Sequence, residues 1–189
     1  TFEEFVNRAK ILDRYRRIYS PAIGTGPTME YLTQTGLDAA RGADILKVAP
    51  QGYTSSIEYA DNKIAAELRD IAKVHIANLG TRVFYCDHGS FDTHATQVPV
   101  HAQLWDEISH AVTDFFDDLR EHDMADNVMM FMFSEFGRRT QDNGSGTDHG
   151  SAGPCFVIGD SVKGGTFSEF PSLEEKDLEQ GDLVPNLDF

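Results

Sequence analysis

The sequence predicts an α/β fold in which helices cover a mainly parallel sheet, and three observations support this prediction. A β-type run, Arg82–Cys86 (RVFYC), precedes a long amphipathic stretch, and Val128–Phe133 (VMMFMF) is almost continuously apolar, as in a strand buried on both faces. A strand–helix–strand unit of this kind forms a parallel pair with a right-handed crossover. Polar loops follow both runs, and ligands in open α/β sheets bind beyond the carboxyl ends of the parallel strands.

Composition narrows the classes of function. The chain has 189 residues with 31 acidic and 16 basic side chains, giving a net charge of −15. This balance argues against a nucleic-acid partner, which needs a basic face, and its simplest meaning is solubility. A small anionic ligand stays compatible with it, because a metal ion and a nearby arginine can reverse the local field. No apolar run approaches the roughly 20 residues of a membrane span.

The first quarter of the chain predicts a peripheral helical region, residues 1–54, that carries no recognisable chemistry. Phe2–Tyr19 has the apolar spacing of an amphipathic helix, and a Pro- and Gly-rich stretch follows it. Met29–Pro50 predicts one or two short helices. No signal peptide is visible, but the chain begins at Thr1 rather than Met, and we expect it to be a segment of a longer protein.

Residues 55–165 predict the core, and 166–189 predict an acidic surface segment. A helix is expected from the serines at 55 and 56, either of which could cap it, to Gly80, and a second from about Val100 to His122. Pro154–Ile158 (PCFVI) is a third strand candidate. Residues 134–153 have no helical pattern, so an antiparallel return is the simplest connection to that strand. It would bring three polar clusters to one sheet edge.

The first two clusters follow the first two predicted strands. Asp92 and His94 lie two residues apart on a loop and can point at one ion, although an Asx turn explains the same pattern. Glu135 directly follows the most apolar strand, where a carboxylate is costly unless it is paired or ligated. It is a candidate ligand or general base, and Arg138 is a candidate clamp for an anion. A structural ion pair between Glu135 and an arginine is the alternative.

The third cluster is Asp148-His149, with glycines on both sides that allow the backbone to approach a ligand. A mobile loop would have the same composition. Together Asp92, His94, Glu135, Asp148 and His149 predict a site for a divalent metal such as Zn, Mn, Ca or Mg, provided that the third strand is antiparallel. His101, near the start of the second helix, could also reach this site.

The motifs GSFDTHATQ, SEFGRR and GTDHG resemble the bacterial family known as domain of unknown function 1501, over roughly Ser55 to Gly165. That family is similar to the alkaline-phosphatase-like superfamily of phosphatases and sulfatases. The resemblance implies an alkaline-phosphatase-like sheet, incomplete in this chain, and export to the periplasm or beyond. By position, Asp92 and His94 look like the superfamily's first ligand pair, Glu135 like its strand-end ligand and His149 like its late histidine.

The same resemblance implies a metal-dependent hydrolase of phosphate or sulfate esters, acting on a small anionic ester or a sulfated saccharide. Two departures weaken the parallel. Phe136 stands where the superfamily has a second imidazole, and the nucleophile would lie upstream of Thr1. The alternative is a non-catalytic exported module that binds polysaccharide or protein and keeps a structural or degenerate metal site.

Overall fold

The computed structural model describes residues 13–14, 17–18 and 26–186, and its contacts divide the chain into two compact units, Thr1–Tyr53 and Thr54–Phe189. In the first unit, α2 (Pro27–Val48) is one helix of 22 residues, followed by the 3-10 helix η3 (Ala49–Gly52). The expectation of one or two short helices at 29–50 is therefore correct in type but wrong in length, because one long helix covers most of this segment. The predicted helix at 2–19 lies largely outside the described residues.

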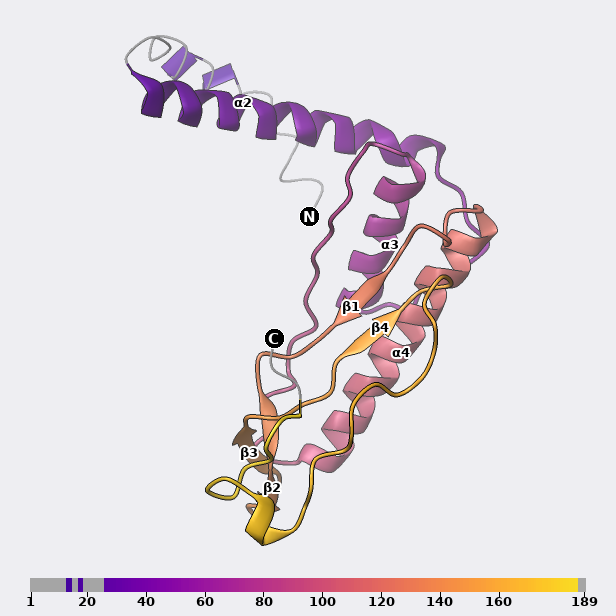
Figure 1. Ribbon diagram of the computed structural model, residues 1–189. Coiled ribbons are helices and arrows are strands. Elements are labelled where there is room, and N and C mark those ends of the chain that lie inside the picture. The colour runs from indigo at the N-terminus through magenta and orange to yellow at the C-terminus, as the bar shows by residue number, and fades with distance from the viewer. Residues whose placement is uncertain (1–12, 15–16, 19–25, 187–189) are drawn as a thin grey trace. The chain divides into compact units, whose positions relative to one another are not determined.

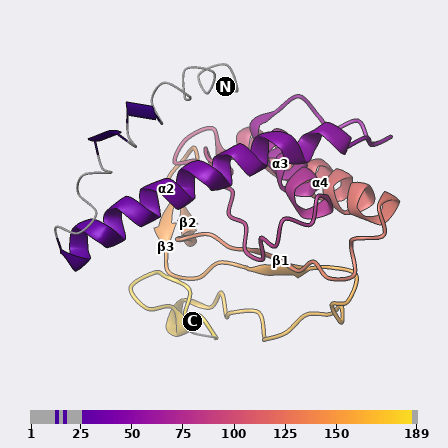
Figure 2. The ribbon, with the colours of Figure 1, turned by 90° about the horizontal axis from the view of Figure 1, so that it is seen from above.

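The second unit contains a helix pair and two short antiparallel sheets. Helix α3 (Lys63–Ile76) packs against α4 (Gln97–Glu121), and β1 (Met130–Met132) pairs with β4 (Phe156–Ile158). Figures 1 and 2 show the two helices side by side with β1 next to them. The fold is thus mixed α/β.

The helices form because their apolar residues recur at helical spacing and meet in one core. That core contains Leu68 and Leu119, at 3% and 0% exposure, and the ring pair Phe115–Phe116. The partly buried Val128, Met130 and Ile158 pack onto it from the sheet side. Burying such side chains contributes about 1.5–3 kcal/mol each relative to exposure.

The start of α3 corrects one prediction. The helix begins at Lys63 rather than at residue 55, because the Asn62 side chain accepts the hydrogen bond of the Ala65 N–H at 2.9 Å. Ser56 instead donates from its hydroxyl to Glu121 at 2.7 Å, near the end of α4. The second helix runs from Gln97 to Glu121, so the predicted α4 is confirmed within three residues of each expected end.

The strand predictions are confirmed in part. The antiparallel return is correct, since Met130 lies opposite Ile158 and Met132 opposite Phe156. Burial on both faces is wrong for β1, because Phe131 and the flanking Phe133 remain 51% and 58% exposed. Residues 81–90 belong to no helix or strand, so the described part of the chain forms no parallel pair there.

The interpretation of residues 134–153 as a loop is wrong. They contain an antiparallel hairpin, β2 (Gly137–Asp142) and β3 (Thr147–Gly150), in which Arg138 lies opposite His149. Its turn is closed by the Asn143 N–H, which donates to the Gly146 carbonyl at 2.8 Å. Figure 1 shows this hairpin beside the first turn of α4.

The remaining residues add little regular structure. Beyond β4 lie the 3-10 helix η4 (Glu175–Asp177) and an isolated bridge between Glu179 and Asp182. In the described helices no stretch is long and apolar enough to cross a membrane.

Candidate metal site

Asp92, His94 and His149 bring one ligand atom each to within 4.8 Å of one another. The Nε2 atoms of His94 and His149 lie 2.7 and 2.6 Å from the same oxygen, Asp92 Oδ1. The two imidazole rings stack with centroids 4.7 Å apart. Two segments separated by more than fifty residues thus meet at one point of the surface, where all three side chains are exposed.

The turn of the hairpin lies in close contact with the Asp92–His94 loop. A Cβ at Gly146 would lie 2.6 Å from the Thr93 carbonyl oxygen, so this position accepts only glycine without a shift of backbone. Ser145 fixes the start of α4: its hydroxyl accepts from the Thr96 N–H at 2.8 Å, and its carbonyl accepts from the Gln97 N–H. The turn therefore holds the loop through backbone contacts rather than through the site side chains.

Arg138 joins the two segments that carry the candidate ligands. Its guanidinium donates from one terminal nitrogen to the Thr147 carbonyl and from the other to the Phe91 carbonyl, each at 2.6 Å. These carbonyls precede Asp148-His149 and Asp92 in the chain. The same guanidinium lies 4.0 Å from Asp92 Oδ1. Arg138 is thus engaged within the protein at the place where the sequence suggested a clamp for an anion.

Asp148 and Asn143 support the cluster from its edge. His94 Nδ1 lies 3.3 Å from Asp148 Oδ1, so this carboxylate can fix the orientation of the His94 ring. Asn143 donates from Nδ2 to the His94 carbonyl at 3.1 Å and, more weakly, to Asp148 at 3.4 Å. Asp148 therefore lies one bond behind the ligand atoms, whereas Glu135 is exposed after β1 and is not part of the cluster.

Aromatic rings hold the site from two sides. Phe136 stacks on His149 with centroids 3.9 Å apart and planes within 4°, and the Arg138 guanidinium lies 5.0 Å from its centroid. Phe91 meets His101 and Trp105 edge to face. His101 therefore packs under the loop through Phe91 and Trp105, and burial lowers its pKa, with the charge of Arg138 adding to the effect.

The electrostatics favour ionised carboxylates. The hydrogen bond from His149 lowers the pKa of Asp92 below its ordinary value, and the nearby His94 and Arg138 add to this shift. The hydrogen bond from His94, followed by the one from Asn143, lowers the pKa of Asp148. Both acids are thus negative at neutral pH, as metal ligation or its support requires.

The donor set fits a divalent transition metal. Two imidazole nitrogens and one carboxylate oxygen suit Zn and Mn, whereas Ca prefers oxygen ligands alone. Ligand atoms about 2.0–2.2 Å from a tetrahedral ion lie roughly 3.3 Å apart. Here His149 Nε2 lies 2.6 Å from Asp92 Oδ1 in a hydrogen bond, and His94 Nε2 lies 2.7 Å from the same oxygen in an ion pair. Each nitrogen would therefore move about half an ångström farther from this oxygen when an ion binds between them.

Sequence reasoning missed Phe136, Asn143 and Ser145. Asn143-Gly144 is a strong hairpin signal between two short extended runs, and it could have located the turn that carries two of them. The stacking of Phe136 on His149 has no comparable signal in the sequence, because it depends on how β3 folds back against β2.

Comparison with known proteins gives one match. A family described as "Protein of unknown function (DUF1501)" matches residues 31–188. No curated protein and no solved structure matches the chain.

Proposed function

The chain belongs to the family described as "Protein of unknown function (DUF1501)", and we propose that it uses Asp92, His94 and His149 to bind one divalent transition-metal ion. We propose further that the bound ion serves the hydrolysis of a phosphate or sulfate ester. The observation that carries the proposal is the meeting of three metal-type ligand atoms, within 4.8 Å, from two distant segments.

The number and exposure of the ligands favour a reactive site over a structural one. Structural zinc sites are closed by four protein ligands, whereas catalytic sites keep three and leave a position open to water or substrate. Here the side chains of His94 and His149 are 46% and 45% exposed. When bound, a metal ion supplies Lewis-acid polarisation of an ester oxygen and a water of lowered pKa.

The residues of the chain then have separate roles. Asp92, His94 and His149 hold the ion, and Asp148 keeps the His94 ring in the tautomer that presents Nε2. Arg138 positions the two ligand segments through the Phe91 and Thr147 carbonyls. Glu135 lies exposed after β1 and remains a candidate proton acceptor in the presence of a bound substrate.

The finer assignments are supported by resemblance rather than by contacts. We propose an alkaline-phosphatase-like sheet in which Arg82–Cys86 becomes a strand parallel to β1, and an exported location. Support for the strand comes from Val83 and Tyr85, which are 86% and 81% exposed although they are typical strand residues. Such side chains fit a segment that pairs with further strands.

A non-catalytic module with a degenerate or structural metal site is the second candidate. Arg138 favours it, because the guanidinium nearest to the site donates to the Phe91 and Thr147 carbonyls and is not available to neutralise an ester anion. This module would bind polysaccharide or protein without turnover.

The test combines metal analysis with an activity assay. Purified protein is dialysed against Zn²⁺ or Mn²⁺, and its metal content is compared with that of His149→Ala and of a matched control, His110→Ala, whose side chain is 67% exposed on α4. We expect a single equivalent in the wild type and the control and almost none in His149→Ala. Asp148→Asn should bind about 10–100-fold more weakly.

Hydrolysis of p-nitrophenyl phosphate and p-nitrophenyl sulfate by the same samples separates the two candidates. Turnover that EDTA abolishes and that His149→Ala lacks supports the hydrolase. Stoichiometric metal without turnover supports the binding module. A wild type that holds no metal, or a His149→Ala variant that keeps it all, contradicts the site itself.

A further inference from the structure

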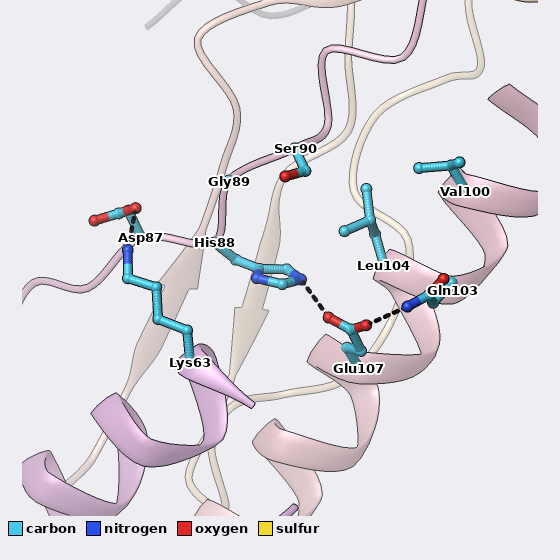
Figure 3. Close-up of a pocket in the computed structure, with 9 residues that line it drawn as sticks. All are labelled: Lys63, Asp87, His88, Gly89, Ser90, Val100, Gln103, Leu104 and Glu107. Atoms are coloured by element: carbon cyan, nitrogen blue, oxygen red, sulfur yellow. Dashed lines mark hydrogen bonds and ion pairs between the residues drawn. The ribbon is translucent and has the colours of Figure 1, made fainter. Parts of the chain in front are cut away.

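A second concave site lies in the same unit, between the first turn of α3, the first half of α4 and residues 87–90 (Figure 3). The pocket has a volume of about 430 Å³, within the roughly 300–1,000 Å³ of ordinary small-molecule sites. Its lining is shared by Lys63, residues 87–90, Val100, Gln103, Leu104 and Glu107. Asp92, His94 and His149 are absent from this lining.

Two polar atoms face each other in this pocket without a hydrogen bond between them. His88 Nε2 lies 3.6 Å from Glu107 Oε2, beyond hydrogen-bond range, and the His88 side chain is only 11% exposed. This nitrogen is shielded from solvent and has no hydrogen-bond partner in the part of the chain that the structure describes. A buried polar atom left in this state costs about 1–3 kcal/mol, so it is expected to have a partner when the site is in use.

Glu107 carries a negative charge that no lysine or arginine among the described residues offsets. Its other oxygen accepts from the neutral Gln103 amide at 2.8 Å. The Lys63 ammonium lies 2.9 Å from Asp87 and 3.5 Å from Glu67, so it is already neutralised on the rim. Figure 3 shows these as separate pairs, with Lys63 directed at Asp87 and the His88 ring directed at Glu107. A carboxylate that is only 26% exposed favours a cationic partner.

The other wall of the pocket is aliphatic, formed by Val100 and Leu104, of which Leu104 is 6% exposed. The backbone opposite is constrained: Ser90 has a φ of 73°, a left-handed conformation that non-glycine residues adopt at a cost and that clusters at ligand sites. The pocket thus offers two hydrogen-bond acceptors at one place and a short apolar surface beside them.

We propose that this pocket binds a small aliphatic primary amine in its ammonium form. The ammonium has three N–H donors, of which one serves Glu107 Oε2 and another serves His88 Nε2 once the ring turns this shielded nitrogen toward the pocket. The alkyl stem lies against Val100 and Leu104. This site is independent of metal binding at Asp92, His94 and His149.

The experiment is an NMR titration of the full chain with n-butylammonium chloride, in EDTA so that metal binding has no part in it. The salt concentration is held at about 0.15 M, which screens the diffuse attraction of cations to an acidic surface. n-Butanol and sodium butyrate are matched probes that lack the charge or reverse it. We expect saturable shifts confined to residues 87–90, 100 and 103–107 with butylammonium alone.

Two variants and a control locate the site. Glu107→Gln should weaken the binding of butylammonium at least tenfold, and Asp106→Asn, an exposed neighbour on the same helix, should leave it unchanged. If Glu107→Gln does not fold, His88→Phe removes the acceptor while keeping a ring against Phe91. Equal binding of n-butanol, unsaturable shifts over the acidic surface, or unchanged affinity in a folded Glu107→Gln or His88→Phe would overturn the proposal.

Discussion

Helices α3 and α4 meet through apolar side chains that are almost completely buried, such as Leu68 and Leu119, whereas the β2–β3 hairpin has a single buried residue, Gly137, in its two strands. The hairpin is instead held by hydrogen bonds, by close backbone contacts at glycines and by the Arg138 guanidinium. The two regions lie in one compact unit but are stabilised by different physical interactions.

This difference bears on the candidate metal site. Apolar burial stabilises the helix pair whether or not a ligand is bound, since it depends only on excluding water. His149 lies on the hairpin, and Asp92 and His94 lie on the loop that the hairpin contacts. An ion shared by these segments adds its binding free energy to their attachment, about 2.7 kcal/mol at a ligand concentration of 100 times Kd. We therefore expect metal to stabilise the hairpin more than the helices.

The largest expected effect is on the helix pair. Leu119→Ala should lower the free energy of unfolding by about 3 kcal/mol, because it removes a fully buried side chain and leaves a cavity. Urea denaturation followed by circular dichroism measures this loss, with Leu79→Ala, 36% exposed, as the matched control. A loss no greater than that of the control would show that the helices are not held by this core.

The second prediction concerns the hairpin. A Cβ at Gly137 would lie 1.8 Å from the Ala152 carbonyl oxygen, which is backbone and cannot rotate away. Gly137→Ala should therefore cost about 2 kcal/mol, weaken metal binding and leave α3 and α4 intact. Hydrogen exchange resolves the two regions, and Gly164→Ala, which meets no atom within 4 Å, is the control. If hydrogen exchange became equally faster in α3 and α4, the hairpin and the helix pair would not be stabilised independently.

The helix pair was largely predictable from sequence, because its pattern is local. The apolar spacing of α4 places Leu104, Ala111, Phe115 and Leu119 on its buried side, and its limits follow within a few residues. The start of α3 was not predicted, since Ser55, Ser56 and Asn62 are all acceptable caps. Only the tertiary contact of Ser56 with Glu121 decides among them.

The candidate metal ligands were predictable from the sequence, but the hairpin that positions them was not. Asp92, His94 and His149 were expected to converge because an antiparallel β4 returns the chain to one edge, and the structure brings them together. The sequence predicts a loop in place of the β2–β3 hairpin, because these two strands are too short and polar to show alternation. Arg82–Cys86 has a strand composition, yet strand pairing depends on neighbouring segments that the local pattern does not specify.

A third prediction separates the positioning role of Arg138 from a role in binding an anion. Arg138→Lys keeps the charge but cannot reach the Phe91 and Thr147 carbonyls together, so we expect a loss of about 1–2 kcal/mol and weaker metal binding. Arg139→Lys, at an exposed position, is the control. If metal content and stability are unchanged while KM for an ester rises, Arg138 contacts substrate instead of positioning the loops.

The smallest effect expected is the pH dependence of the helix layer, which rests on His122 at the end of α4. Its Nδ1 and Nε2 lie 2.8 and 2.9 Å from the Asp118 and Thr54 carbonyls, and both nitrogens can donate only when the ring is protonated. The hydrogen bond to the Asp118 carbonyl raises the pKa of His122 above its ordinary value of 6.5, helped by the Thr54 carbonyl and by the charges of Asp118 and Glu121.

Because the folded-state pKa is raised, this contribution is fully present below the unfolded pKa and is lost as pH rises through the folded one. The unfolding free energy of the wild type should therefore fall relative to that of His122→Gln as pH increases above about 6.5, by less than about 1 kcal/mol because the ring is partly exposed. Urea titrations in EDTA at several pH values measure it, with His110→Gln as the control on the same helix. Parallel pH profiles for the wild type and His122→Gln would mean that the hydrogen bonds of His122 do not stabilise the end of α4.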